Sequence, residues 1–293
     1  MPFEDYISTS YAEIAAAETE LGHIRQAGFR KVPTQGTANG IWADCAMMAG
    51  NPPPMYYASS PLVAAQIKRS TDGGLNHGEG VYPAGKFLKQ VLMMNTSTAG
   101  NPCGYMLCDY LMYYPFIDMS VTDYQAMTNG VALPRYQTGA GVRMFALVVA
   151  PQIGGVTFTV QYTNSDGVAG RVTPAVTCNA QAANGTIIHS HSVNAGCTAG
   201  PFIPLQAGDS GVRAIEGVTF QSADVGLITL VLVKPLANLQ TLENTAPAEV
   251  DYFVNKTASI QIWDDAYLNF LLCGAGTVTT GVLMGMLTTI WSQ

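Results

Sequence analysis

The stretch "TFTVQYT", residues 157–163, places Phe158, Val160 and Tyr162 two residues apart, with Thr or Gln between them. Successive side chains of a strand point to opposite faces, so this alternation predicts a β-strand with one buried face and one face toward solvent or a partner. A second stretch, "LITLVLV" (227–233), is apolar on both faces, which indicates a central strand or one at an interface. These two patterns indicate a mainly β protein.

Eight further short runs are apolar or alternating and are separated by Gly, Asn, Asp and Pro, which is typical of strands between turns. They lie at 86–94, 104–117, 142–150, 171–178, 186–193, 211–220, 259–272 and 281–291. Ten such runs in one chain favour a sandwich or barrel, and we expect a β-sandwich of jelly-roll-like type.

The N-terminal region has a different pattern. Tyr11, Ile14 and Leu21 fall near one face of a helix over residues 4–28, and Gly28 can close it. This pattern predicts an N-terminal helix. Two roles stay open for it: a terminal helix packed on its own domain, or an arm that reaches a neighbouring subunit.

Residues 30–65 are rich in Gly and Pro and include "NPPP" (51–54), which favours an extended connecting arm. A short helix is expected at 61–68, and a loop or short helix at 235–250. The predicted division is a helix and arm over 1–85, a β-sandwich domain over 86–240, and C-terminal strands over 241–293.

Composition points to assembly. The chain is 48% hydrophobic and only 11% charged, against about 25% charged residues in typical domains. Because large apolar patches are rare on monomers, so few charges suggest that much of the surface meets other subunits. The net charge of −7 comes without any cluster of Lys and Arg, so direct nucleic-acid binding is not expected. No apolar run has the length of a membrane span, and the start lacks a signal-peptide pattern.

The six cysteines lack a CxxC pair, and no His lies at metal-ligand spacing from any of them. We therefore interpret them mostly as reduced core residues. A pairing of Cys103 with Cys108, or a hairpin bridge from Cys178 to Cys197, stays open. The two remaining cysteines are Cys45 and Cys273.

Gly208-Asp209-Ser210-Gly211 resembles the nucleophile loop of chymotrypsin-like serine proteases. The family motif continues with Gly-Pro, whereas Val212 and Arg213 follow here, and no Ala-Ala-His-Cys-like segment precedes it. Asp, Ser and Gly are also the residues that tight turns prefer. We therefore expect a turn that feeds a strand beginning at Val212, and we do not expect an enzyme.

Three other stretches could carry chemistry. His189 and His191 share one face of a predicted strand, but a metal would need a third ligand from elsewhere. The Gly-rich segment 71–80 lacks the Lys-Ser/Thr of a phosphate loop, so it is expected to be a flexible loop. Asp264 and Asp265 are adjacent, point to opposite faces of a strand, and fit a turn better than a carboxylate pair. No metal or cofactor is predicted.

Five large aromatic residues in low-charge surroundings are the candidate interface anchors, because such side chains give large contact areas. The alternative for each is burial in the core of its own subunit. The five residues are Trp42, Tyr56, Tyr57, Trp263 and Trp291.

Several blocks of this sequence resemble virion structural proteins of tailed bacteriophages. They are "GIWADCAMMAGNPPPMYYASSPLVAA" (40–65), "PLQAGDSGVRAIEGVTF" (204–220) running into "GLITLVLVKPL" (226–236), and "WDDAYLNFLLCGAGTVTTGVLMGMLTTIW" (263–291). The resemblance implies a component of the virion, assembled in the host cytoplasm, and no catalytic residues carry over from it.

The major capsid fold of such phages has a long spine helix, which this sequence does not predict. We therefore expect a head decoration, cement or minor capsid protein that stabilises the shell by burying apolar area between subunits. A homotrimer is expected because closed symmetry removes open-ended contacts, and the expected partners are other copies and the major capsid protein. A tail, adaptor or receptor-binding protein is the alternative, and a hydrolase using Ser210 is a further one.

Overall fold

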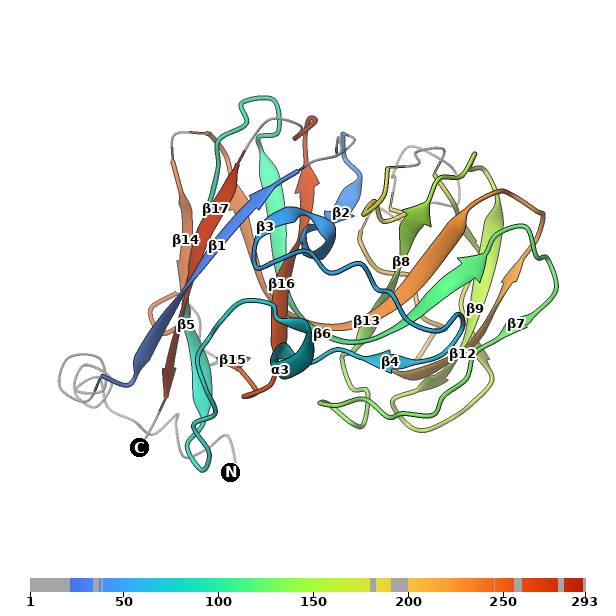
Figure 1. The fold of residues 1–293 in the computed structure, drawn as a ribbon, viewed down its shortest axis with the longest axis horizontal. Helices are drawn as coiled ribbons and strands as arrows, with labels where there is room; N and C mark the ends of the chain where they lie inside the picture. The colour runs from blue at the N-terminus through green and yellow to red at the C-terminus, as the bar shows by residue number, and fades with distance from the viewer. Residues whose placement is uncertain are drawn as a thin grey trace.

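The computed structural model describes residues 22–33, 37, 39–179, 183–190, 200–244, 246–255, 260–278 and 282–291. Within these ranges the chain forms three antiparallel β-sheets and almost no helix, so the prediction of a mainly β protein is confirmed. Figure 1 shows two groups of strands, with β6 (Cys103–Asp118) and β13 (Leu227–Thr241) running from one group into the other.

The first sheet has the strand order β14-β5-β17-β1-β3, with β15 also paired to β5. An interior pair of this sheet joins distant parts of the chain, since β1 pairs with β17 from Ile24 opposite Ile290 to Lys31 opposite Leu283. Strands from all three predicted segments therefore share this sheet. The bounds are β1 Ile24–Val32, β3 Ala49–Asn51, β5 Lys86–Asn95, β14 Ala248–Asp251, β15 Ile260–Gln261 and β17 Leu283–Trp291.

The central sheet has the order β2-β16-β6-β13-β8, with β4 also paired to β6, and the third sheet has the order β10-β9-β12-β7, with β11 also paired to β9. The central strands besides β6 and β13 are β2 Trp42–Asp44, β4 Ala65–Gln66, β8 Arg143–Ala150 and β16 Tyr267–Gly274. The third sheet contains β7 Gln125–Ala126, β9 Thr157–Asn164, β10 Arg171–Val172, β11 Val176–Thr177 and β12 Val212–Phe220.

The two stretches that indicate the fold class behave as predicted. In β9 the side chains of Phe158, Val160 and Tyr162 are buried, and the Thr and Gln residues between them are half-buried. In β13 the six residues from Ile228 to Val233 are all buried, as expected for a central strand. The alternation in β9 therefore places its buried apolar side chains on one face of the third sheet.

The two long strands contribute to two cores. Leu107 in β6 packs in a cluster with Val91 of the first sheet, whereas Leu230 in β13 packs in a cluster with Val160 of the third sheet. Each such fully buried side chain contributes roughly 1.5–3 kcal/mol to folding. The central sheet is therefore packed against a different sheet at each of its two ends.

The central sheet also closes on itself. Thr186 forms a bridge to Ala43 in β2, and Ile187 forms a bridge to Leu147 in β8. Since β2 and β8 are the two edge strands of this sheet, residues 186–187 join its edges. The face enclosed in this way holds a third buried cluster, and neither edge is left open to another chain at these positions.

The predicted N-terminal helix over 4–28 is wrong where the structure describes it. Residues 24–28 begin strand β1, in which Ala27 and Phe29 alternate with exposed residues and pack into the core. Pairing with β17 and burial outweigh the local helix preference of Arg25, Gln26 and Ala27. Residues 4–21 lie outside the described residues.

The extended arm predicted over 30–65 is folded onto the molecule. It contains the end of β1, the strands β2 and β3, and the 3-10 helix η1 (Cys45–Met47). Met55 and Tyr57 are buried in the closed central sheet. The short helix expected at 61–68 is also wrong, because β4 lies there and the single-turn helix α3 (Arg69–Asp72) follows it.

Two further expectations are wrong. Residues 235–250 were expected to be a loop or short helix, but β13 continues to Thr241 and β14 begins at Ala248. Residues 186–193 were expected to be a strand, but 186–187 form only single bridges, and 191–193 lie outside the described residues. Among the residues that the structure describes, no helix has the length and apolar character needed to cross a bilayer.

Candidate interaction surface

A groove of about 690 Å³ lies where β16 ends and β6 begins, on a half-exposed part of the central sheet. We call it the Trp42 groove. It is lined by Gly40, Trp42, Pro102, Gly104, Tyr105, Met106, Asn238, Leu239, Gln240, Cys273, Gly274 and Ala275. None of these residues is charged.

The strand register explains the shape of the groove. Trp42 pairs with Cys273, Cys273 pairs with Gly104, and Gly104 pairs with Gln240, so these four residues form one row across β2, β16, β6 and β13. Gly104 has no side chain, and a Cβ placed there would lie 3.9 Å from its nearest neighbour, the Cys273 carbonyl oxygen. The missing side chain leaves the floor hollow between the half-buried Trp42 and the exposed Gln240.

The chemistry of the Trp42 groove suits an apolar partner with a few polar atoms. Trp42 and Met106 offer partly exposed apolar surface, and Asn238 and Gln240 offer amide groups. Burial raises the pKa of the half-buried Cys273 thiol, which favours the uncharged form. A contact here would therefore bury no ionised side chain of the groove, which avoids a large desolvation cost.

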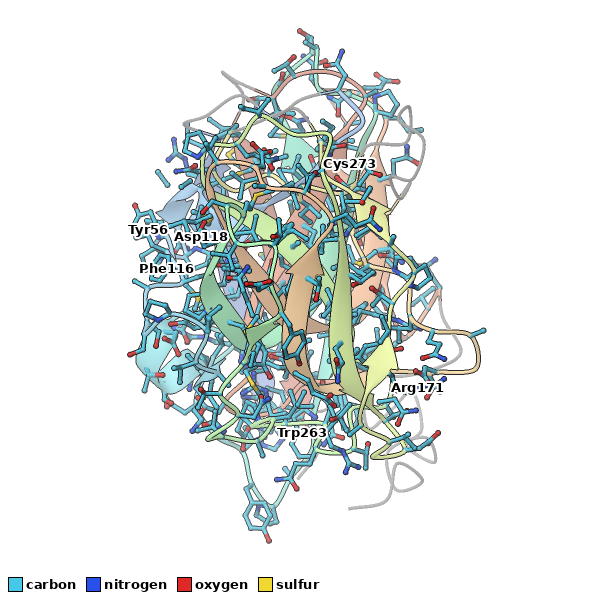
Figure 2. The ribbon with its side chains drawn as sticks, turned by 90° about the vertical axis from the view of Figure 1, so that its right-hand side faces the viewer. Tyr56, Phe116, Asp118, Arg171, Trp263 and Cys273 are labelled. Carbon is cyan, nitrogen blue, oxygen red and sulfur yellow. The ribbon has the colours of Figure 1, made fainter. Side chains whose placement is uncertain are left out.

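Tyr56 lines a smaller cavity of about 290 Å³ on the other side of β2. Met47, Met48 and Asn184 also line it, together with Ala43, Asp44 and four further residues, Thr37, Ala49, Gly185 and Thr186. The Tyr56 side chain is 63% exposed, and it is labelled at the left edge of the molecule in Figure 2. Two of the five predicted anchors thus lie at β2: Trp42 is its first residue, and Tyr56 lines a cavity together with Ala43 and Asp44 of the same strand.

Tyr57 is a core residue and not a surface anchor, because it is only 1% exposed. Its hydroxyl donates a hydrogen bond to Oδ2 of Asp44, and the hydroxyl of Tyr110 donates to Oδ1 at 2.6 Å. Burial raises the pKa of Asp44, and the two hydroxyls and the Ala46 amide oppose that rise. The cluster holds Asp44 and Tyr57 inside the closed central sheet.

The other two predicted anchors lie elsewhere. Trp263, between β15 and β16, is 43% exposed and makes an edge contact with Tyr136, with ring centroids 6.1 Å apart. Trp291, at the end of β17, is half-buried and stacks on His23. Figure 2 shows Trp263 near the lower end of the molecule and Cys273 of the Trp42 groove near the upper end. The structure therefore does not gather the five aromatics into one patch.

The sequence analysis missed the most exposed large hydrophobic side chain among the described residues, Tyr82, which is 90% exposed. It lies in the segment "GVYPAG", residues 80–85, which we call the Tyr82 loop and which carries no charge. The signal for it was an aromatic residue between two glycines just before a strand. The predicted Gly-rich loop over 71–80 stops two residues short of it.

The base of the Tyr82 loop is held firmly. The buried ammonium of Lys86 donates to the Glu79 carbonyl oxygen at 2.7 Å and lies 3.4 Å from Oδ1 of Asp264. That same carboxylate oxygen accepts from the Val81 amide at 3.1 Å, and the Ala84 amide donates to the Val81 carbonyl oxygen. A loop fixed in this way loses little further entropy when it binds.

His77 completes this base. Its Nε2 lies 2.9 Å from the Ala266 carbonyl oxygen, and its Nδ1 lies 3.4 Å from Nζ of Lys86. Burial lowers the pKa of His77 to about 4, so the ring is neutral at pH 7. Nε2 then donates to Ala266 and Nδ1 accepts from Lys86, which leaves both ring nitrogens paired.

Ala207 and Gly208 form a turn closed by a hydrogen bond from the Asp209 amide to the Gln206 carbonyl oxygen, and Gly211 forms a bridge to Ala140. The next strand begins at Val212, as predicted. The Asp209 carboxylate accepts from Tyr162 at 2.6 Å, Asn164 at 2.8 Å and Arg171 at 2.9 Å. These contacts, of which the hydrogen bond from Arg171 has the largest effect, lower the pKa of Asp209 to about 2. Ser210 is exposed, and its Oγ lies 2.8 Å from Oγ of Ser165.

The remaining candidates are placed as follows. His189 is fully buried with an edge contact to Phe158, and burial lowers its pKa to about 3, whereas His191 lies outside the described residues. Asp264 and Asp265 lie in the predicted turn, where Asp265 accepts from Ser70. Within the described ranges no three His, Cys, Asp or Glu side chains are grouped so as to hold a metal ion.

Four described cysteines, Cys45, Cys103, Cys108 and Cys273, are free thiols. Cys45, Cys103, Cys108 and Cys178 are buried, and Cys273 is half-buried. Cys103 and Cys108 are thus not bonded to each other, and Cys197 lies outside the described residues.

No protein-family model, curated protein or solved structure matches this chain.

Proposed function

We propose that the protein is a structural subunit of a phage particle, of the capsid decoration, cement or minor capsid type, and that it works through contacts between its own copies and with other particle proteins. The observation that carries the assembly part is the uncharged surface formed by the Trp42 groove, together with the exposed Tyr82. Apolar, aromatic-rich surface without charge is typical of the buried centre of protein interfaces.

The composition supports the same proposal, because only 11% of the residues are charged. Membership of a phage particle rests on the sequence resemblance. A jelly-roll-like sandwich is also part of the proposal, supported by the packing of the central sheet against the first and third sheets. A tail, adaptor or receptor-binding component is the second candidate, and the aromatic tip of the Tyr82 loop is the observation in its favour.

The first experiment is the molar mass of the purified chain by light scattering on a sizing column, over a hundredfold range of concentration. The proposal expects a trimer or another closed ring of the 31.0 kDa chain. A monomer at every concentration would contradict self-assembly. Particle membership is tested by separating particles from the producing culture on a density gradient, where peptides of this chain must follow the particle band.

A further inference from the structure

The Tyr82 loop and the Trp42 groove lie at opposite ends of the same strands. β5 starts at Lys86, directly after the loop, and runs for ten residues to Asn95, from which a short connection leads to Pro102 of the groove. Ten strand residues span about 30 Å. β16 begins at Tyr267, directly after Asp264 and Ala266 at the base of the loop, and runs to Cys273 and Gly274 in the groove.

Both figures agree with this placement. In Figure 1 the arrowhead of β16 points away from β15 and α3. In Figure 2 Trp263, the residue before Asp264, is labelled near the lower end, and Cys273 near the upper end. A loop and a groove at opposite ends cannot meet within one copy, but they can meet between two copies stacked end to end.

The two surfaces match in charge and chemistry. The Tyr82 loop and the lining of the Trp42 groove contain no Asp, Glu, Lys, Arg or His. A volume of about 690 Å³ falls in the range that binds drug-sized molecules, so it can accept an aromatic side chain. Trp42 and Met106 suit the Tyr82 ring, and the amide of Gln240 suits its hydroxyl.

We propose that the Tyr82 loop of one copy docks into the Trp42 groove of a second copy. The inference rests on the proposed function, since it names the contact through which the subunits assemble. Tyr82 fills the hollow above Gly104, and the base formed by Lys86, His77 and Asp264 holds the loop in its docking shape. Because the two surfaces differ, the contact is head to tail, and it builds a ring when the rotation between copies closes.

The test uses two variants of the full chain that each lose one half of the contact. Tyr82→Ala removes the tip and keeps the groove. Gly104→Leu fills the hollow, where a Cβ has room, and keeps the tip. We expect each variant alone to have a dissociation constant raised by at least about 30-fold, as for a central anchor residue. If Gly104→Leu fails to fold, Gln240→Arg, at an exposed position of the groove lining, is the second variant that obstructs the groove.

The decisive sample is a mixture of the two variants. The intact groove of Tyr82→Ala can accept the intact loop of Gly104→Leu, so light scattering should detect a complex of two chains that grows no further. Tyr124→Ala, which removes a half-exposed tyrosine from the connection before β7, is the matched control and should assemble as the unaltered chain does. Circular dichroism checks the fold of every variant.

The outcomes separate the two proposals. Variants that assemble as strongly as the unaltered chain overturn the docking contact and leave the proposed function standing. Variants that are monomeric but give no two-chain complex when mixed overturn the head-to-tail arrangement. An unaltered chain that is monomeric at every concentration overturns both.

Discussion

Asp109 and Arg135 form a buried ion pair with two parallel hydrogen bonds: Nε donates to Oδ2 at 2.8 Å, and Nη2 donates to Oδ1 at 2.7 Å. Nη2 also donates to the Tyr110 carbonyl oxygen at 2.8 Å. Asp109 lies in the middle of β6, and Arg135 lies between β7 and β8. The pair therefore fastens that connection to the central sheet.

Arg135→Leu should lower the free energy of unfolding by about 3–5 kcal/mol, because it leaves the buried Asp109 carboxylate without its cation. Urea denaturation followed by fluorescence measures the loss. The double variant Asp109→Leu/Arg135→Leu should recover part of it, since no buried charge remains. A double variant as unstable as the single one would show that the loss comes from packing and not from the unpaired charge.

His77→Gln should make stability less sensitive to acid. Burial lowers the pKa of His77 from 6.5 to about 4 in the folded chain. Between these values the unfolded chain binds a proton and the folded chain does not, so the free energy of unfolding falls as pH drops. The fall amounts to about 3 kcal/mol at most. Urea denaturation at pH 7 and pH 4.5 measures it, and equal pH dependence in both proteins would contradict the prediction.

Tyr57→Phe should lower the free energy of unfolding by about 1–3 kcal/mol, because Oδ2 of the buried Asp44 loses its hydroxyl donor. The oligomeric state should not change, since Tyr57 lies in the core. Tyr56→Phe is the matched control, because the neighbouring side chain is mostly exposed and should tolerate the loss of its hydroxyl. Thermal unfolding and light scattering distinguish the two roles, and a change of molar mass with Tyr57→Phe would place this residue at an interface.

Gly211→Ala should destabilise the fold more than Ser210→Ala. A Cβ at Gly211 would overlap the Gly139 carbonyl oxygen and lie 2.7 Å from the Gly141 amide nitrogen, so the backbone must shift at a cost of about 1–3 kcal/mol. Ser210 is exposed and its hydroxyl shares a hydrogen bond with the exposed Ser165 hydroxyl, so its loss should change stability little. Thermal unfolding of both variants makes the comparison, and a larger loss with Ser210→Ala would contradict it.

The strands were predictable where a local pattern matches the burial in the fold, as in β9. Strands that form because of partners distant in the sequence were not predictable. Residues 24–28 form a strand because β17 and the core lie beside them, which no local pattern reports. Pro235 suggested the end of a strand, but β13 continues through it to Thr241. At Pro235 the strand no longer pairs with β8, and a bulge follows in its pairing with β6, so the missing amide donor is tolerated there.

The interaction surface was predictable in part. Trp42 and Tyr56 were found as large aromatics in low-charge sequence, and both line cavities. Tyr57 lies in the same low-charge sequence but is buried, and its hydroxyl donates a hydrogen bond to Asp44. The hollow above Gly104 depends on the register of four strands from distant parts of the chain, so the sequence alone could not reveal it.

The pairing of β1 with β17 has a consequence for biosynthesis. Ile24 finds its partner, Ile290, only after nearly the whole chain has been translated. At roughly 5–20 residues per second, the ribosome needs on the order of 15–60 seconds to make the intervening chain. During that time β1 lacks its β17 neighbour in the first sheet, and a nascent chain that stalls before residue 283 leaves that sheet without the strand between β5 and β1.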